Sequence, residues 1–513
     1  MSATGLATSL PSAGTLALAA ADALLVLAAL VALMRRHAEA FPLLVILTLP
    51  FRVPIATDGR TVNLLVPLYL VVAAGAVAHL LPRWLALARW LTRERSRPPE
   101  GTGAEPRPRL SSASSWLTPR ALEWALLAAV VLYALQASYS ADRLKALENL
   151  AFFYVPFGLM FLVLRDVRWT RALLARCLGL AVALALIFAS VGFVEYARKS
   201  VFLNPKVVVA NEYDNYFRVN SVFFDPSIYG RFLAMVMIAV TAFVLSPRGA
   251  ADLSPRDASA PRGAGEGPAD ARRAWLRGRR GTLAGALVLL WLLAGLVTSF
   301  SQSSIAALLL GMAALAAWCW GWRPTLAVTG ALLALALAFV LLAPASLHFG
   351  LKGSKGSTAN ATSGRTTLVS GGLELFAQRP LEGYGAGSFE TEYKRHSGGD
   401  VENATTASHT IPVTIAAEQG IVGLAVYVAL LASAFAVLFR GAGRAPPRIA
   451  VAACFAALVL HTWTYADFLE DPTTWLLLAL GVTLARAGAS DARRGAGADG
   501  QAPHALSAGA ASQ

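Results

Sequence analysis

The chain has 513 residues, of which 56% are hydrophobic and 14% are charged, and its mean hydropathy is +0.56. Soluble proteins carry about a quarter of charged residues, so this composition excludes an ordinary soluble fold and indicates a polytopic membrane protein. The formal net charge of +14 is read as a topology signal rather than as nucleic-acid binding, because arginine gathers in alternate loops between apolar segments.

Long apolar segments recur along the chain. A bilayer core about 30 Å thick requires roughly 20 apolar residues per helix, and about thirteen segments approach that length. The segment 41–57 is the weakest, because Pro50, Arg52 and Pro54 interrupt it, and it is predicted to be kinked or re-entrant if it does not span. The sequence predicts an all-α fold, a membrane bundle of about 12–13 transmembrane helices with a large extracytoplasmic loop domain. The predicted spans are 14–34, 41–57, 62–82, 121–137, 148–164, 172–194, 227–245, 282–299, 304–321, 325–344, 411–438, 449–465 and 473–487.

The distribution of arginine predicts the orientation of the bundle. The loops 83–120 and 246–280 and the tail from Arg486 hold much of the arginine, so they are predicted to be cytoplasmic by the positive-inside rule. The N-terminus is then predicted outside and the C-terminus inside. The loops 195–226 and 345–408 face the extracytoplasmic side.

Composition also predicts how the chain divides. The stretches 94–118 and 246–278 are rich in Pro, Gly, Ser, Ala and Arg without apolar periodicity, so they are predicted to be disordered cytoplasmic loops. The predicted parts are 1–345 with helices 1–10, 346–410 as the extracytoplasmic loop with the candidate catalytic residues, 411–487 with helices 11–13, and 488–513 as a disordered cytoplasmic tail.

Cysteine and metal-binding patterns point to no cofactor. Cys177, Cys319 and Cys454 lie within predicted helices, which indicates neither a disulfide framework nor a thiolate metal site. The chain also has no HExxH, no Asp, Glu and His clustered at ligand spacing, and no GxxxxGK[ST] phosphate loop. Neither a metal nor a nucleotide is therefore predicted.

A Gly-rich polar stretch before the last apolar segments has residues suited to chemistry. It reads GRTTLVSGGLELFAQRPLEGYGAGSF and carries Arg365 near its start. An amphipathic helix is predicted from about Thr366 to Ala377, and Pro380 ends it. The glycines of GYGAGSF are predicted to form turns rather than a phosphate cradle.

Two histidines and a glutamate follow that stretch. His396 is flanked by cations, whereas His409 lies just before a long span that begins TIPVTIAAEQGIVGL. Glu418 falls about two turns into that span, where a charge in lipid costs roughly 2.5–3.5 kcal/mol. Glu418 is therefore expected to face the protein interior and a partner there.

These motifs resemble the O-antigen ligase and Wzy-type polysaccharide polymerase superfamily. Arg365 with its helix, RPLEGYGAGSF, His409 and the downstream AEQGIVGL carry the resemblance, together with RVNSVFFDPSIYGRFL, which begins at Arg218. Two positions depart from the family pattern. Thr410 stands where asparagine commonly follows the histidine, and Ser301-Gln302-Ser303-Ser304 stands where the outer turn often reads Ser-Arg.

The resemblance implies an enzyme that transfers a glycan from a polyprenyl-pyrophosphate carrier to an acceptor hydroxyl. The expected location is the outer face of the bacterial cytoplasmic (inner) membrane, and the expected chemistry requires no metal. The implied enzyme is a membrane glycosyltransferase, either a polymerase of repeat units or a ligase of O-antigen or another surface polysaccharide. Its expected partners are the lipid-linked donor, a glycan or lipid acceptor and the bilayer.

Residue roles follow from the resemblance and from side-chain chemistry. Arginine binds phosphate oxygens bidentately and stays charged, whereas histidine has an unperturbed pKa of about 6.5 that suits a general base. His409 is assigned as the general base, with Arg218 and Arg365 as pyrophosphate ligands. Arg231, one turn into the next helix, either joins them or snorkels to the headgroups. His396 is the alternative base.

Other readings remain open. A multi-spanning transporter or lipid-linked glycan flippase would place ionisable groups near the midplane of several helices, whereas the predicted spans are mostly Ala, Leu and Val. A noncatalytic scaffold would tolerate replacement of the arginines and histidines. Asp467, Glu470 and Asp471 lie in the last outer turn and can orient a sugar hydroxyl, although a solvated turn is the favoured interpretation.

Overall fold

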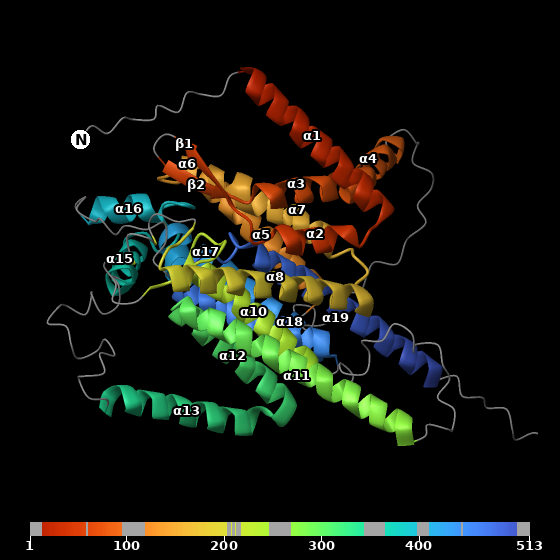
Figure 1. Ribbon diagram of the computed structural model, residues 1–513. Helices are drawn as coiled ribbons and strands as arrows, with labels where there is room; N and C mark the ends of the chain where they lie inside the picture. The colour runs from red at the N-terminus through yellow and green to blue at the C-terminus, as the bar shows by residue number, and fades with distance from the viewer. Residues whose placement is uncertain are drawn as a thin grey trace, which may run out of the picture.

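The computed structural model describes residues 13–57, 60–94, 118–202, 207, 211, 217–245, 268–342, 365–397, 410–442 and 445–499. In these residues the fold is a bundle of long helices with one short β-hairpin (Figure 1). The elements up to residue 198 are α1 Ala13–Arg36, α2 Ala40–Thr48, β1 Val53–Thr57, β2 Arg60–Leu64, α3 Val66–Gly75, the π-helical turn η1 Ala76–Leu80, α4 Leu81–Glu94, α5 Pro119–Ala137, α6 Arg143–Asn149, the π-helical turn η3 Leu150–Tyr154, α7 Val155–Leu164 and α8 Arg171–Arg198. The later elements are α10 Pro226–Val244, α11 Pro268–Thr298, α12 Gln302–Trp320, α13 Trp322–Leu342, α15 Arg365–Gln378, α16 Phe389–His396, α17 Ile411–Phe439, α18 Pro446–Thr464 and α19 Pro472–Asp499.

Nine helical segments of the described chain are long and apolar enough to cross a membrane. Each coincides with a predicted span, so the helical membrane class is confirmed. The predicted spans 14–34, 325–344 and 473–487 also lie in helices, namely α1, α13 and α19, but these helices are not among the nine. The nine segments are Val66–Ala86, Pro119–Ala137, Arg143–Leu164, Arg171–Arg198, Pro226–Val244, Gly281–Thr298, Gln302–Trp320, Ile411–Phe439 and Pro446–Thr464.

The predicted span 41–57 is wrong as a single membrane helix. Helix α2 ends at Thr48 after nine residues, or about 14 Å at 1.5 Å per residue, which is less than half of the bilayer core. The antiparallel strands β1 and β2 follow, with five residues in each. Pro50 and Pro54 disfavour helix here, and the Val, Ile and Thr residues that follow favour extended backbone.

Helices α10 and α18 form the centre of the bundle. In each of them 67% of the apolar segment is buried, compared with 17–44% in the other seven. Small residues allow this close packing, because a Cβ added at Gly311 of α12 would lie 2.2 Å from Ile238 of α10 and 3.4 Å from Ala457 of α18. In Figure 1, α8, α10, α11 and α12 run side by side.

One end of the bundle carries α15, α16 and the loop between them, which we call the arm (Arg365–His396). The hairpin β1–β2 and α6 lie toward the same end (Figure 1). Of the predicted outer loop 346–410, the structure describes residues 365–397 and Thr410. Helix α11 begins at Pro268 and α19 ends at Asp499, so both helices enter stretches predicted as a linker and a tail.

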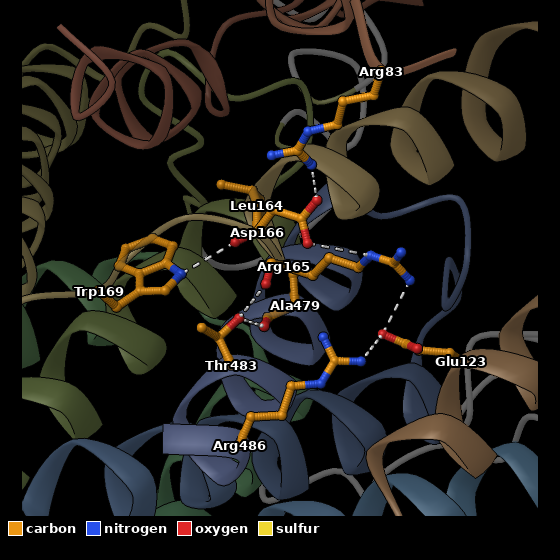
Figure 2. A network of polar contacts seen from close by, with 9 residues as sticks. All are labelled: Arg83, Glu123, Leu164, Arg165, Asp166, Trp169, Ala479, Thr483 and Arg486. Atoms are coloured by element: carbon orange, nitrogen blue, oxygen red, sulfur yellow. Dashed lines mark hydrogen bonds and ion pairs between the residues drawn. The ribbon is translucent and has the colours of Figure 1, made fainter. Parts of the chain in front are cut away.

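Charged residues tie the helices together at the opposite end (Figure 2). Arg83 of α4 pairs with Asp166 after α7. Glu123 near the start of α5 pairs with Arg165 at 3.1 Å and with Arg486 of α19 at 2.7 Å. Partly exposed pairs of this kind contribute about 0.2–1 kcal/mol each. This arginine-rich end is the one predicted to be cytoplasmic.

Candidate functional site

Four glycines with positive φ allow the arm to lie close to α17 and to the segment from Ser140 to Ala146. Gly383, Gly385 and Gly387 have φ of 69°, 96° and 74°, and Gly420 interrupts α17 with φ of 64°. A Cβ at Gly383 would lie 2.3 Å from the Glu418 carbonyl oxygen, and one at Gly420 would lie 2.2 Å from that of Leu381. The glycines of GYGAGSF therefore form turns, because neither the angles nor the space admits a side chain.

Hydrogen bonds fasten this contact. The Ile421 N–H donates to the Pro380 carbonyl oxygen at 2.7 Å, and the Gly385 N–H donates to that of Glu418 at 2.8 Å. The Glu418 carboxylate, 6% exposed, accepts the N–H groups of Gly387 at 2.9 Å and Phe389 at 3.0 Å. These two amides are the interior partner that the position of Glu418 requires.

The turn between α5 and α6 supports the arm from the other side. The Tyr139 hydroxyl donates to the Glu382 carbonyl oxygen at 2.8 Å, and the Ser140 hydroxyl donates to that of Ala386 at 2.8 Å. The Thr391 hydroxyl of α16 donates to the Asp142 carboxylate at 2.9 Å. The arm loop is thus held between α17 and this turn.

Helix α15 runs alongside the first part of α17 in the same direction. Gly372 of α15 packs against Val413, and Pro380, just after α15, bonds to Ile421. Both pairs have the same separation in sequence, so the two helices are parallel and keep one register. Because α15 begins at Arg365, its first turn extends past the start of α17. The backbone of Arg365 therefore lies toward the end of α17 that His409 precedes in the chain.

A buried ion pair links α10 to the loop before α19. Arg231 of α10 pairs with Asp471 at the start of α19, and their side chains are 4% and 3% exposed. The Asp471 carboxylate also accepts the Thr473 N–H at 2.7 Å and caps α19. Among the described residues, Nη1 of Arg231 has no hydrogen-bond partner. Arg231 therefore faces the protein interior rather than the headgroups, with one donor available.

Arg218 lies close to Arg231 through the serine turn, Ser299–Ser304. Its Nε donates to the Ser299 carbonyl oxygen at 3.3 Å. On the α10 side, a Cβ added at Gly230, the neighbour of Arg231, would lie 2.8 Å from the Ser304 hydroxyl and 3.0 Å from that of Ser299. The two arginines therefore flank one turn of the chain.

His461 of α18 contacts the serine turn. Its Nε2 lies 3.3 Å from the hydroxyls of Ser303 and Ser304, and the side chain has no exposed surface. The residue was missed in the sequence, although an ionisable side chain inside a predicted span is itself a signal of function. Glu195 of α8 was also missed, and its carboxylate accepts the Ser221 N–H at 2.7 Å, which ties the segment after Arg218 to α8.

The loop between α18 and α19, Tyr465–Asp471, is named the acidic loop. Burial raises the pKa of Asp467, although the charges of Arg231 and Arg52 oppose the rise. Burial and the charge of Asp467 raise the pKa of Glu470 to about 8, and Asn149 donates to the Glu470 carboxylate at 3.0 Å. The interpretation as a solvated turn is wrong for Asp471, which is 2% exposed, whereas Asp467 and Glu470 are half-buried. The loop contacts α10 through Asp471, α6 through Glu470 and α17 through Phe468.

The structure describes one of the two candidate histidines, His396. Nδ1 of His396 donates to the Glu392 carbonyl oxygen at 2.9 Å, and its ring contacts that of Tyr384 at 5.9 Å. His396 thus lies against its own helix and the arm loop. His409 and the side chain of Arg365 lie outside the described residues, so their predicted roles remain predictions.

Comparison with known proteins bears on the same region. Residues 287–428 match the family model described as O-Antigen ligase, whereas no curated protein matches the chain. The resemblance is therefore confirmed over the serine turn, the arm and Glu418, and Arg218, Arg231 and the acidic loop lie outside the matched range. The chain is a multi-pass membrane protein with a segment similar to O-antigen ligases, a family that implies a membrane enzyme transferring glycans from lipid-linked substrates.

Proposed function

Because residues 287–428 match the O-antigen ligase family, we propose that the chain transfers a glycan from a polyprenyl-pyrophosphate carrier to an acceptor hydroxyl. The reaction takes place at the outer face of the cytoplasmic membrane. The observation that supports this proposal is the position of α15 beside α17, since the backbone start of α15 at Arg365 lies toward the end at which α17 begins.

Arg218, Arg231 and Arg365 are the proposed ligands of the donor diphosphate. Arg231 supports this role because its buried guanidinium has an Nη1 donor without a hydrogen-bond partner. A phosphate oxygen would accept that hydrogen bond. Asp471 neutralises part of its charge and holds its orientation. Arg218 adds a second, half-buried guanidinium beside the serine turn.

His409 is the proposed general base. It removes the proton of the acceptor hydroxyl while the acceptor oxygen bonds to the anomeric carbon of the donor sugar. The bond between that carbon and the phosphate oxygen breaks, and its electron pair leaves on the polyprenyl diphosphate. The arginines stabilise the charge that develops on this leaving group, and general-base help contributes about 10²–10⁴-fold in rate.

The first test is the glycan profile of a deletion strain complemented with the wild type, His409→Ala, Arg365→Ala or His396→Ala. Membrane levels of each protein are matched by immunoblot. We expect His409→Ala and Arg365→Ala to abolish the wild-type profile and His396→Ala to retain it. Single repeat units on the normal acceptor identify a polymerase, and unattached polymer on the carrier identifies a ligase.

Other outcomes contradict the proposal. If both His409→Ala and Arg365→Ala restore the wild-type profile, the assignment of these residues to the site is wrong. Loss with His396→Ala alone moves the base to that residue. Accumulation of unprocessed lipid-linked units on the cytoplasmic face, instead of the outer face, indicates a flippase.

A further inference from the structure

We propose that Glu418 is a positioning residue that holds the arm in register with the start of α17. The inference rests on the proposed function, because the arm begins at Arg365 and α17 follows His409. Its carboxylate bridges two segments: it lies on α17 and binds the amides of Gly387 and Phe389 in the arm. Neither Glu418 nor those amides touch substrate in this assignment.

A carboxylate suits this contact better than a neutral side chain. Each of its two oxygens accepts one amide, so both donors are satisfied at 2.9 and 3.0 Å. Phe389 is the first residue of α16, where unpaired N–H groups and the helix dipole favour a negative charge. Glutamine at 418 offers one acceptor and turns an NH₂ group toward the other amide.

The Glu418 carboxylate and the two amides it accepts are called the clamp. The clamp adds to the backbone hydrogen bonds between the arm and α17, and the remainder of this contact is apolar packing. Leu368 and Leu375 of α15, Tyr393 of α16 and Ala417 of α17 form a small cluster separate from the main core. A cluster of this size does not by itself prevent the arm from sliding on α17. The bonds of Glu418, together with the backbone bonds at Gly385 and Ile421, fix one position.

The register of α15 on α17 affects the reaction because it sets the position of Arg365. The register that Glu418 maintains determines how far the Arg365 end of α15 projects beyond the start of α17. A misplacement of about 1 Å in a catalytic arrangement costs on the order of 10²-fold in rate. Glu418 thus acts through Arg365 and His409, and its loss lowers turnover more than donor binding, to which Arg218 and Arg231 contribute from the bundle.

The test compares purified full-length Glu418→Gln with Glu382→Gln, which removes an exposed carboxylate from the same loop. With a lipid-linked glycan donor, we expect Glu418→Gln to lower kcat about 10- to 100-fold and to change the KM for the donor less than about threefold. Glu382→Gln keeps both constants. Hydrogen exchange at Gly387 and Phe389 should accelerate in Glu418→Gln alone.

A disulfide staple separates positioning from chemistry. In a Cys319→Ser background, Gly372→Cys and Val413→Cys are added to Glu418→Ala. A Cβ at Gly372 meets the Val413 side chain, so the two cysteines are placed to join α15 to α17. We expect the kcat of the oxidised protein to be at least about tenfold higher than that of the reduced protein.

The failures of the two proposals are distinguishable. If the wild type transfers glycan and His409→Ala does not, but Glu418→Gln matches the wild type in kcat and amide exchange, the positioning role is wrong and the proposed function stands. If the staple forms without rescue, Glu418 does not act by positioning. If the wild type shows no transfer while amide exchange still responds to Glu418→Gln, the clamp exists and the proposed function is wrong.

Discussion

At the scale of single residues, three buried charged side chains stand out because each requires a partner. Arg231 and Asp471 are almost inaccessible, and Glu418 is 6% exposed. Each is costly to bury unless paired, and each has a specific partner from a distant part of the chain. The partners are a carboxylate, a guanidinium and two backbone amides.

The ion pair makes stability and activity separable. Asp471→Ala leaves the Arg231 charge buried without its partner, which should destabilise the protein by about 3–5 kcal/mol. The double variant Arg231→Met with Asp471→Asn removes both charges and keeps a capping side chain on α19, so its thermal midpoint should return close to that of the wild type. It should still lose transfer, because the proposed phosphate ligand is gone. A stable and active double variant would show that Arg231 binds no diphosphate.

Glu470 predicts a pH dependence of stability. Its folded-state pKa is raised from 4.5 to about 8, so the folded protein holds a proton that the unfolded chain releases above about pH 4.5. Stability should fall as pH rises from about 4.5 to about 8 and then level off. Thermal unfolding between pH 5 and 9 measures this slope. Glu470→Gln should flatten it, whereas Glu374→Gln, an exposed acid on α15, should not; parallel curves for all three proteins contradict the assignment.

At the scale of elements, backbone conformation decides how the arm meets the bundle. The loop before α16 and the kink in α17 touch through main-chain atoms, which requires glycine on both sides. Helix α17 is therefore two pieces joined at Gly420. The first piece carries the arm, and the second packs on α18 and α19.

Gly385→Ala tests the other side of the arm loop, where it meets the turn between α5 and α6. Its φ is 96°, and a Cβ would lie 2.3 Å from the Cα of Ser140, so strain of about 1–3 kcal/mol and a backbone clash should displace the loop. We expect faster proteolysis of the arm and loss of transfer. Gly179→Ala on α8 is the matched control, because nothing lies within 4 Å of its added Cβ and alanine favours helix. Equal behaviour of the two variants would contradict the close approach.

At the scale of the whole molecule, the two ends of the bundle differ in chemistry. One end gathers the arm, the serine turn and the acidic loop, where Arg231, Asp471 and Glu418 are buried and paired with groups from other elements. The other end has exposed arginines that pair with Glu123 and Asp166 (Figure 2). This polarity matches the arginine distribution along the sequence, which predicts the second end to be cytoplasmic.

The helical membrane class and most of the spans could be predicted from the sequence alone. Hydropathy and length are local properties, and a bilayer requires each spanning segment to satisfy its own backbone. The resemblance over the arm was also readable, because Arg-Pro, the spaced glycines and Glu-Gln-Gly are short local motifs. The segment 41–57 failed because its apolar length resembles a span while its prolines favour a hairpin.

Partners between distant segments were decided by the tertiary structure. No local pattern shows that Asp471 is buried and pairs with Arg231, or that Glu418 reaches Gly387 and Phe389. These contacts join residues that are far apart in sequence, so they exist only once α10, α17, α18 and α19 have packed. Hydropathy and motif determined which segments enter the membrane and where chemistry belongs, and packing determined which charges meet there, because the cost of burying a charge depends on what the fold places beside it.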